Sequence, residues 1–97
     1  MAAYRLTAKA QSELDHVYEY SIFSFGLAKA QAYLTGLHRA FGLLSEHPRM
    51  GRDCSHLRKG LRRHEHVSHS IFYRQTKGGV LIVRVLGPGQ DPTREVP

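Results

Sequence analysis

The N-terminal half of the chain contains two consecutive stretches in which apolar residues recur at helical spacing. In residues 8–25, one helical face collects small and apolar side chains at steps of three and four: Ala10, Leu14, Val17, Ser21 and Phe25. The second stretch repeats this pattern with Ala30, Leu34, Leu37, Phe41 and Leu44. Thr7 is placed to cap the first helix and Gly26 to end it. Two helices joined by so short a turn predict an antiparallel hairpin, whose apolar faces need a third surface.

The remaining apolar positions follow the pattern of strands. A short strand is predicted at 3–7, and three more at 61–66, 68–75 and 80–86, with a hairpin turn at 76–79. The run VLIVRVL at 80–86 predicts the central strand, in which Arg84 must reach water or a partner. The expected fold is α+β, in the order β-α-α-β-β-β, with the helical hairpin packed on one face of a small, mostly antiparallel sheet.

Two segments show neither period. Residues 48–60 combine proline, glycine and cations, and are expected to form a flexible loop. Residues 87–97 are expected to form a turn followed by an extended or flexible tail. With 97 residues, the chain is expected to be a single domain spanning 1–97.

The charge of the chain is unevenly distributed. Residues 1–48 carry four basic and four acidic side chains, whereas residues 49–97 carry ten and four, which accounts for the net charge of +6. This asymmetry indicates an anionic partner, either nucleic acid or an acidic protein segment. The sequence has no signal peptide pattern and no membrane-spanning run, and its single Cys54 agrees with a reducing compartment, so a cytoplasmic location is expected.

The basic segment contains residue types that suit three kinds of chemistry. A cluster suited to RNA cleavage is available: Arg62, Arg63, His64, His66, His69, Arg74 and Arg84. Strand alternation, however, sends Arg62, His64 and His66 to one face and Arg63 to the other, so the charges do not converge. The histidine spacing does not match that of a zinc site, and Cys54 has no identifiable base beside it. We therefore expect no catalytic residue, no metal and no cofactor.

Aromatic residues on the predicted hairpin exceed what its two apolar stripes require. They are Tyr18, Tyr20, Phe23, Phe25 and Tyr33. Exposed aromatics beside a basic sheet suit the docking of an acidic amphipathic peptide. The residues predicted to form this binding site are Tyr18, Phe23, Tyr33, Arg62, Arg63, Arg74 and Arg84.

An ordered set of short motifs spans residues 4–92: YRLT, ELD with EYS, FGLAKAQAYL, LLSEHPRMGR, LRKGLRR, SHSIFYR, and VLIVRVL ahead of DP. This set resembles the ParE toxins of the RelE/ParE superfamily. The resemblance implies a toxin of a type II toxin–antitoxin module that inhibits DNA gyrase by binding, without covalent chemistry, and is neutralised by a ParD-like antitoxin. Direct contact with nucleic acid is compatible with the charge but is not required.

Two alternative functions remain open from the sequence. One is a ribosome-dependent mRNA endonuclease of the RelE type, which would require an acid–base residue near the end of the last strand. The other is an attenuated toxin that only binds its antitoxin. The second arises because Gly87, Pro88, Gly89 and Gln90 stand where similar chains carry a polar, basic segment.

Overall fold

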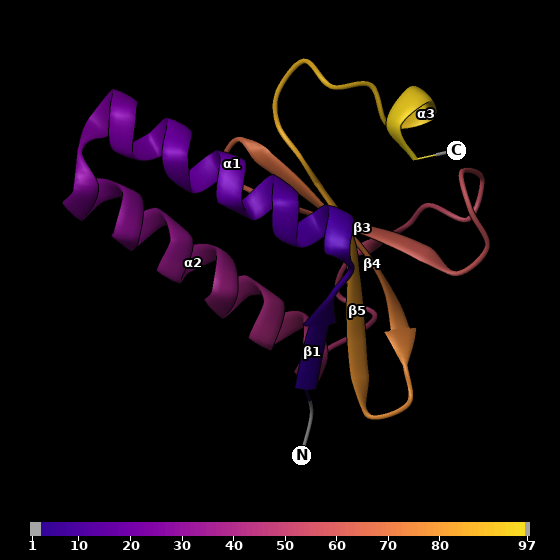
Figure 1. The fold of residues 1–97 in the computed structure, drawn as a ribbon. Coiled ribbons are helices and arrows are strands. Elements are labelled where there is room, and N and C mark those ends of the chain that lie inside the picture. Colours follow the sequence, from indigo (N-terminus) through magenta and orange to yellow (C-terminus); the bar gives the residue numbers. More distant parts are fainter. Residues whose placement is uncertain (1–2, 97) are drawn as a thin grey trace.

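The computed structural model describes residues 3–96 and has the predicted α+β class (Figure 1). In chain order, the elements are β1 (Ala3–Leu6), α1 (Ala8–Phe25), α2 (Leu27–Glu46), β2 (Arg52–Asp53), β3 (Leu61–His66), β4 (His69–Thr76), β5 (Gly79–Leu86) and α3 (Pro92–Glu95). The predicted helices and strands are confirmed to within a residue or two at their ends. Two short elements, β2 and α3, were not predicted.

The strands form one mixed sheet in the order β1-β5-β4-β3-β2. β1 runs parallel to β5, and the other neighbouring strands are antiparallel. β5 is an interior strand, as its apolar run predicts, but the middle position belongs to β4. The reason is that the segment expected to be a flexible loop adds β2 as a fifth strand, which pairs Arg52 with Arg63 and Asp53 with Arg62.

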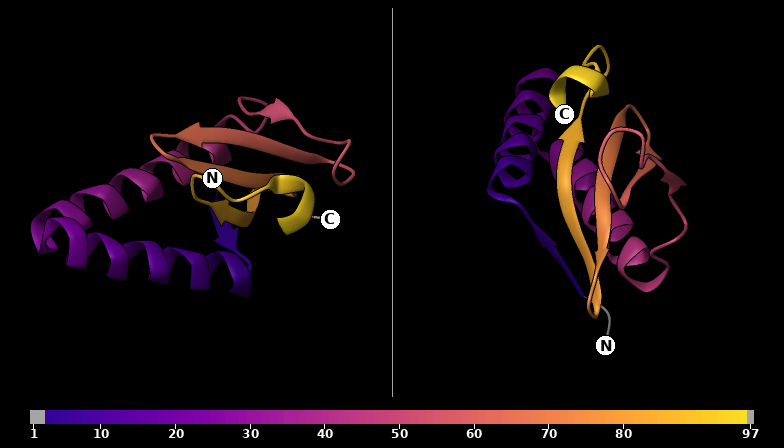
Figure 2. Two further views of the ribbon diagram at one scale, coloured as in Figure 1. Left: turned by 90° about the horizontal axis from the view of Figure 1, so that it is seen from above. Right: turned by 90° about the vertical axis from the view of Figure 1, so that its right-hand side faces the viewer.

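Local sequence signals define the helical hairpin. The Thr7 side chain accepts a hydrogen bond from the Ala10 amide at 3.0 Å, which caps the start of α1. Gly26 adopts a positive φ of 90°, a conformation that glycine tolerates best, and α2 begins directly after it. Both helices lie on the same side of the sheet (Figure 2). Their tip extends past the end of the strands.

The sheet has an apolar cluster on each face. The larger one fills the space between the helices and the sheet, and includes Leu14, Leu37 and Phe41 against Ile71 and Tyr73. The smaller one lies on the opposite face and consists of Cys54, Leu61, Phe72, Val83, Leu86 and Val96, with Leu57 beside it. The tail therefore differs from the extended or flexible segment expected, because α3 brings Val96 into this second cluster, where it is only 2% exposed.

A bulge in the β4–β5 ladder places Arg84. Phe72 pairs with Arg84 and Tyr73 with Ile82, so that Val83 is the extra residue of β5. β1 ends opposite Ile82, and the next part of the β5 edge faces α1 instead of a strand. There the guanidinium of Arg84 pairs with Glu13 at 2.7 Å and with Glu95 at 3.2 Å. The partner that an arginine in this strand requires is thus supplied from within the protein.

The Tyr73 hydroxyl holds the segment after α2 against the sheet. It accepts a hydrogen bond from the Gly51 amide at 2.8 Å and donates one to the Pro48 carbonyl at 2.7 Å. Replacing Tyr73 with phenylalanine leaves the buried Gly51 amide and the partly buried Pro48 carbonyl without this partner, so we expect the free energy of unfolding to fall by about 1–3 kcal/mol. Urea denaturation of the two proteins measures this difference. A loss below about 0.5 kcal/mol would mean that water replaces the hydroxyl.

Candidate interaction groove

A cavity of about 750 Å³ opens between the tip of the helical hairpin and the end of the sheet. Tyr20 and Phe25 of α1 form one wall, Tyr33 of α2 lies on another side, and Ser68 and Pro88 contribute from the strand side. The cavity exists because the hairpin is longer than the strands on which it packs (Figures 1 and 2). A mostly apolar concave surface of this kind is the usual form of a binding site. We call it the hairpin groove.

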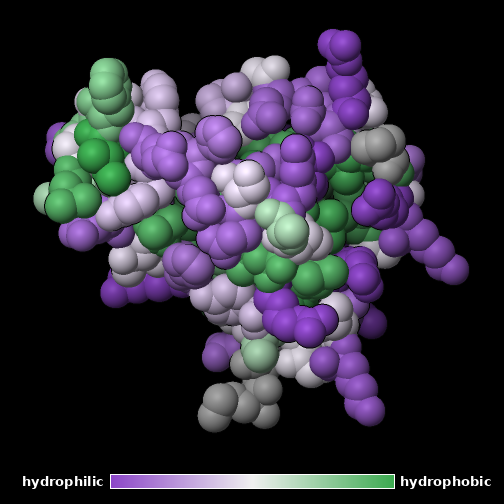
Figure 3. Space-filling view, in the orientation of Figure 1, coloured by the Kyte–Doolittle hydropathy of each residue, from purple (hydrophilic) through white to green (hydrophobic). Residues whose placement is uncertain are grey.

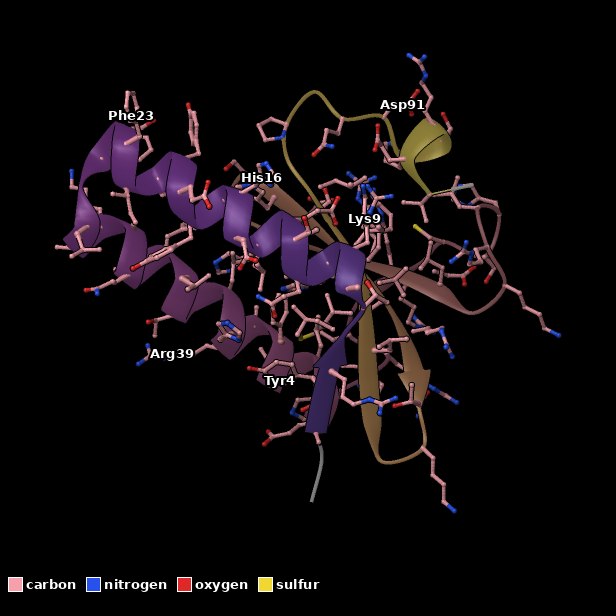
Figure 4. The ribbon with its side chains drawn as sticks, in the orientation of Figure 1. Tyr4, Lys9, His16, Phe23, Arg39 and Asp91 are labelled. Atoms are coloured by element: carbon pink, nitrogen blue, oxygen red, sulfur yellow. The ribbon has the colours of Figure 1, made fainter. Side chains whose placement is uncertain are left out.

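Large apolar side chains at the hairpin tip are exposed to solvent. Phe23 is 94% exposed, Tyr20 68%, Phe25 61% and Leu27 54%. Figure 3 shows apolar side chains gathered at this end of the molecule, and Figure 4 shows Phe23 pointing outward from the end of α1. Contiguous exposed aromatics are unusual on a monomer and mark interaction surfaces. The tip and the hairpin groove therefore form one candidate surface.

Tyr33 and His69 form a hydrogen-bonded pair on the polar side of the groove, and His66, which does not line the groove, packs against Tyr33. The Tyr33 hydroxyl lies 2.6 Å from Nδ1 of His69 and 3.3 Å from the His66 carbonyl. Burial raises the pKa of Tyr33 and lowers the pKa of both His66 and His69. The charge of His64 lowers the pKa of His66 further, and the charge of His66 lowers that of His69. At neutral pH this arrangement therefore presents neutral hydrogen-bonding groups.

The charged groups around the hairpin groove are cationic or can become so. Lys29, His16 and His69 line it, and no carboxylate does. His16 lies on the side of α1 that faces the C-terminal segment (Figure 4). A smaller cavity of about 360 Å³ continues the groove along α1 and shares His16, Val17 and His69 with it. This smaller cavity is also lined by the paired Glu13, Glu95 and Arg84. The hairpin groove itself therefore suits an occupant that is apolar along one side and acidic at its margin.

The structure distributes the seven predicted site residues over several places. Tyr33 lines the hairpin groove, Phe23 lies at the hairpin tip, and Tyr18 is partly buried on α1 without lining the groove. The four arginines do not join them. Arg62 lies on the face of β3 that points toward the helices, because it pairs with the core residue Tyr73, whereas Arg63 and Arg74 point to the opposite face.

Three of these arginines are engaged within the protein. Arg62 donates to the Gly51 carbonyl at 2.6 Å. Arg63 pairs with Glu65 at 2.5 Å and lies 5.3 Å above the Phe72 ring. Arg84 is bound by Glu13 and Glu95, and hydrogen bonding to Glu13 raises its pKa further. We therefore give Arg84 a structural role and leave it out of the candidate surface.

Several residues of the groove were not among those predicted. Tyr20 and Phe25 belong to the surplus aromatics but not to the predicted binding residues. The rest of the lining consists of His16, Val17, Ser21, Lys29, Ser68, His69 and Pro88. The excess of aromatic residues on the hairpin was the sequence signal that could have identified Tyr20 and Phe25. Within residues 3–96, no three His, Cys, Asp or Glu side chains gather closely enough to hold a metal ion. In the same part of the chain, no helix is both long and apolar enough to cross a membrane.

Residues 4–92 match the family described as the ParE toxin of the type II toxin–antitoxin system parDE. The chain belongs to this family. It is 34% identical over 94 residues to Toxin ParE1 of Mycobacterium tuberculosis, covering 96% of both chains. It is also 38% identical over 86 residues to Toxin ParE1 of Caulobacter vibrioides, covering 89% of this chain and 88% of that protein.

The fold is also found in a solved structure described as the chromosomal ParDE TA system from P. aeruginosa. The TM-score is 0.73 at 21% identity, covering 90% of this chain and 96% of that one. The overall arrangement of helices and sheet is therefore shared with that protein.

His69 in the groove and His66 beside it are expected to make stability depend on pH. Burial holds the pKa of His66 and His69 below the ordinary value of about 6.5. The unfolded chain therefore binds more protons than the folded chain once the pH falls below that value, and stability is lost in this range. We expect the urea midpoint to be constant above about pH 7 and to fall toward about pH 5.5. The variant His69→Gln should show a smaller fall, and an unchanged pH profile would contradict this origin.

Proposed function

We propose that this protein is the toxin of a two-protein module, that it stops bacterial growth by binding DNA gyrase in the cytoplasm, and that an antitoxin of the ParD type neutralises it. The observation that carries the proposal is the family match over residues 4–92, which spans almost the whole fold. Inhibition by binding requires a surface and no covalent step, so we propose that the protein is not an enzyme.

The hairpin groove supports the antitoxin part of the proposal. Tyr20, Phe25 and Tyr33 offer apolar area to the buried side of an amphipathic segment, and Lys29 stands at the margin for its acidic residues. Phe23 and Leu27 at the tip extend this surface. An antitoxin segment that becomes ordered on binding would cover these side chains and remove them from water.

The positions of the basic residues support binding over RNA cleavage. Phosphoryl transfer to a 2′-hydroxyl requires an acid, a base and cations around one phosphate. Here Arg62 and Arg63 lie on opposite faces of β3, and Arg84 is held by two carboxylates. These arginines of β3 and β5 therefore do not converge on one phosphate.

The segment Gly87–Gln90 bears on whether toxicity is retained. The Gln90 side chain accepts a hydrogen bond from the Gly87 amide at 2.8 Å, and Pro88 lines the hairpin groove. The turn is thus an ordered part of the candidate surface. We propose that it serves the groove and that the chain remains an active toxin.

Induced expression of the chain in a bacterial host, with and without a co-expressed antitoxin of the ParD type, tests the proposal. We expect growth arrest with a DNA-damage response and intact mRNA, and rescue by the partner. Purified gyrase should accumulate cleaved DNA in the presence of the toxin. Ribosome-dependent mRNA cuts would instead support the endonuclease. Normal growth even without the antitoxin, by a chain that still binds the antitoxin, would support the attenuated toxin.

A further inference from the structure

The face of the sheet that points away from the helices has a covered part and an open part. The C-terminal segment and the loop before β3 cover one part, where Val96 and Leu57 pack on Phe72 and Val83. The other part, near the start of β1 and the β4–β5 turn, is left open (Figure 2, right). A cross-strand row of three residues crosses this open part: Arg5 of β1, Leu81 of β5 and Arg74 of β4.

The directions in which the side chains of this row point follow from strand alternation. Tyr4 and Leu6 pack into the cluster under the helices, so Arg5 between them points to the opposite face. Arg74 pairs with Leu61, a member of the cluster on that same face. Because neighbouring strands lie about 4.8 Å apart, Arg5 and Arg74 are separated by roughly 10 Å across Leu81.

The cations of the open part have no internal partners. Arg5, Arg74 and the turn residue Lys77 are exposed, and none takes part in an ion pair within residues 3–96. Arg58 and Lys59, also exposed, precede Leu61 at the border of the row. The open part is therefore a rigid cationic surface. Cations that fold against a carboxylate, such as Arg63 and Arg84, lie outside it.

The shape and chemistry of this surface favour a duplex over other anionic partners. Both cavities described above lie along α1, on another side of the molecule, whereas the open part is a strand face formed by the row Arg5, Leu81 and Arg74. Its aromatic neighbour Phe72 is fully buried, and the face presents no exposed ring for stacking of single-stranded bases. Regularly spaced phosphates match cations held at fixed separations on strands.

We propose that this open face, centred on Arg5 and Arg74, binds the phosphate backbone of duplex DNA without sequence preference. The inference goes beyond the proposed function, because inhibition of gyrase requires only contact with the enzyme. The hairpin groove lies on a different side, so a toxin bound to its target through other surfaces can also contact the DNA that the target holds. This contact with DNA increases the affinity of the toxin for a target enzyme that is already bound to DNA.

Fluorescence anisotropy with the full chain and a short labelled DNA duplex tests this site over a range of salt concentrations. Each phosphate contact contributes about 0.9 to the slope of log affinity against log salt. The double variant Arg5→Gln, Arg74→Gln is expected to bind more weakly and to lower this slope by about two, and Arg74→Gln alone by about one. Arg39→Gln is the matched control for the single change, since Arg39 is an exposed arginine on α2 (Figure 4).

The control should leave both affinity and slope unchanged. Equal weakening by Arg39→Gln, or binding that is insensitive to Arg5 and Arg74, would overturn the assignment of the face. Duplex RNA or single-stranded DNA bound as tightly as duplex DNA would overturn the assignment of the ligand. The assay contains no gyrase and no antitoxin, so its failure leaves the proposed function standing. Unchanged circular dichroism of the variants confirms that they are folded.

Discussion

Replacing Glu13 with alanine is expected to lower the free energy of unfolding by about 3–5 kcal/mol. The carboxylate accepts hydrogen bonds from Arg84 Nε at 3.1 and 3.0 Å and from Arg84 Nη2 at 2.7 Å. It also accepts a hydrogen bond from the Val85 amide at 2.9 Å. The two charged side chains are only 14% and 12% exposed. The pairing compensates for the removal of both charges from water. Loss of the carboxylate therefore leaves the largely buried Arg84 guanidinium with Glu95 as its remaining partner, and it leaves the Val85 amide unpaired.

The effect should be visible in both thermal and chemical unfolding. For a domain of this size, each kcal/mol lowers the melting temperature by about 4–8 °C. Asp15→Ala is the matched control, because Asp15 is exposed on the same helix and bonds only to the nearby Gln11 side chain. That substitution should change stability by no more than about 0.5 kcal/mol. A loss below about 1 kcal/mol for Glu13→Ala would show that solvent screens the pair as it does at a surface.

The Glu13 substitution also has a local consequence. Arg84 joins α1 to the C-terminal segment, because it bonds to both the side chain and the backbone carbonyl of Glu95. α3 is a short helix, and Val96 after it fills part of the second apolar cluster. Loss of Glu13 removes one of the groups that position Arg84, so amide exchange in residues 93–96 should accelerate more than exchange in β4.

Much of the fold was predictable because the relevant signals are local in the sequence. The stripe that contains Leu37 and Phe41 places one face of α2 in the core, and both residues are fully buried. Thr7 and Gly26 mark the limits of α1 through their own backbone preferences. The TKGG turn brings β4 and β5 together. Each of these features depends on residues within a few positions of one another.

The elements that escaped prediction depend on distant residues. β2 is too short to have a period of its own and exists because Arg52 and Asp53 pair with β3. α3 is ordered through Arg84 and through the apolar pocket that receives Val96. The role of Arg84 could not be assigned from sequence, because its main partner, Glu13, lies 71 positions away. Charge on a predicted strand does not reveal whether the charge is free or paired.

The candidate site was predictable in kind and only partly in residues. Surplus aromatics indicated a docking surface on the hairpin, and Tyr33 and Phe23 lie on the surface observed. Which aromatics line the groove depends on how far the hairpin extends past the sheet, and this length difference is set by packing. Tyr20 and Phe25 consequently enter the site, whereas Arg62, Arg63 and Arg84 serve the fold or the other face of the sheet.

Replacing Tyr20 and Phe25 together with alanine is expected to weaken binding of the proposed antitoxin partner by about 2–4 kcal/mol, or roughly 30- to 1,000-fold in Kd. Both rings line the hairpin groove, where a partner would bury them, and burial of aromatic anchors dominates the energy of most interfaces. Because the side chains are 68% and 61% exposed in the free toxin, the stability of the toxin itself should change little.

Calorimetric titration of the purified toxin variant with the antitoxin measures this loss, and urea denaturation verifies that the variant is folded. Leu43→Ala is the control, since Leu43 is an apolar residue of α2 that is 45% exposed and does not line the groove. It should bind the antitoxin like the native protein. If the double variant binds equally well, the antitoxin must lie on another surface, and the exposed aromatics of the hairpin would then have to serve contact with the target of the toxin.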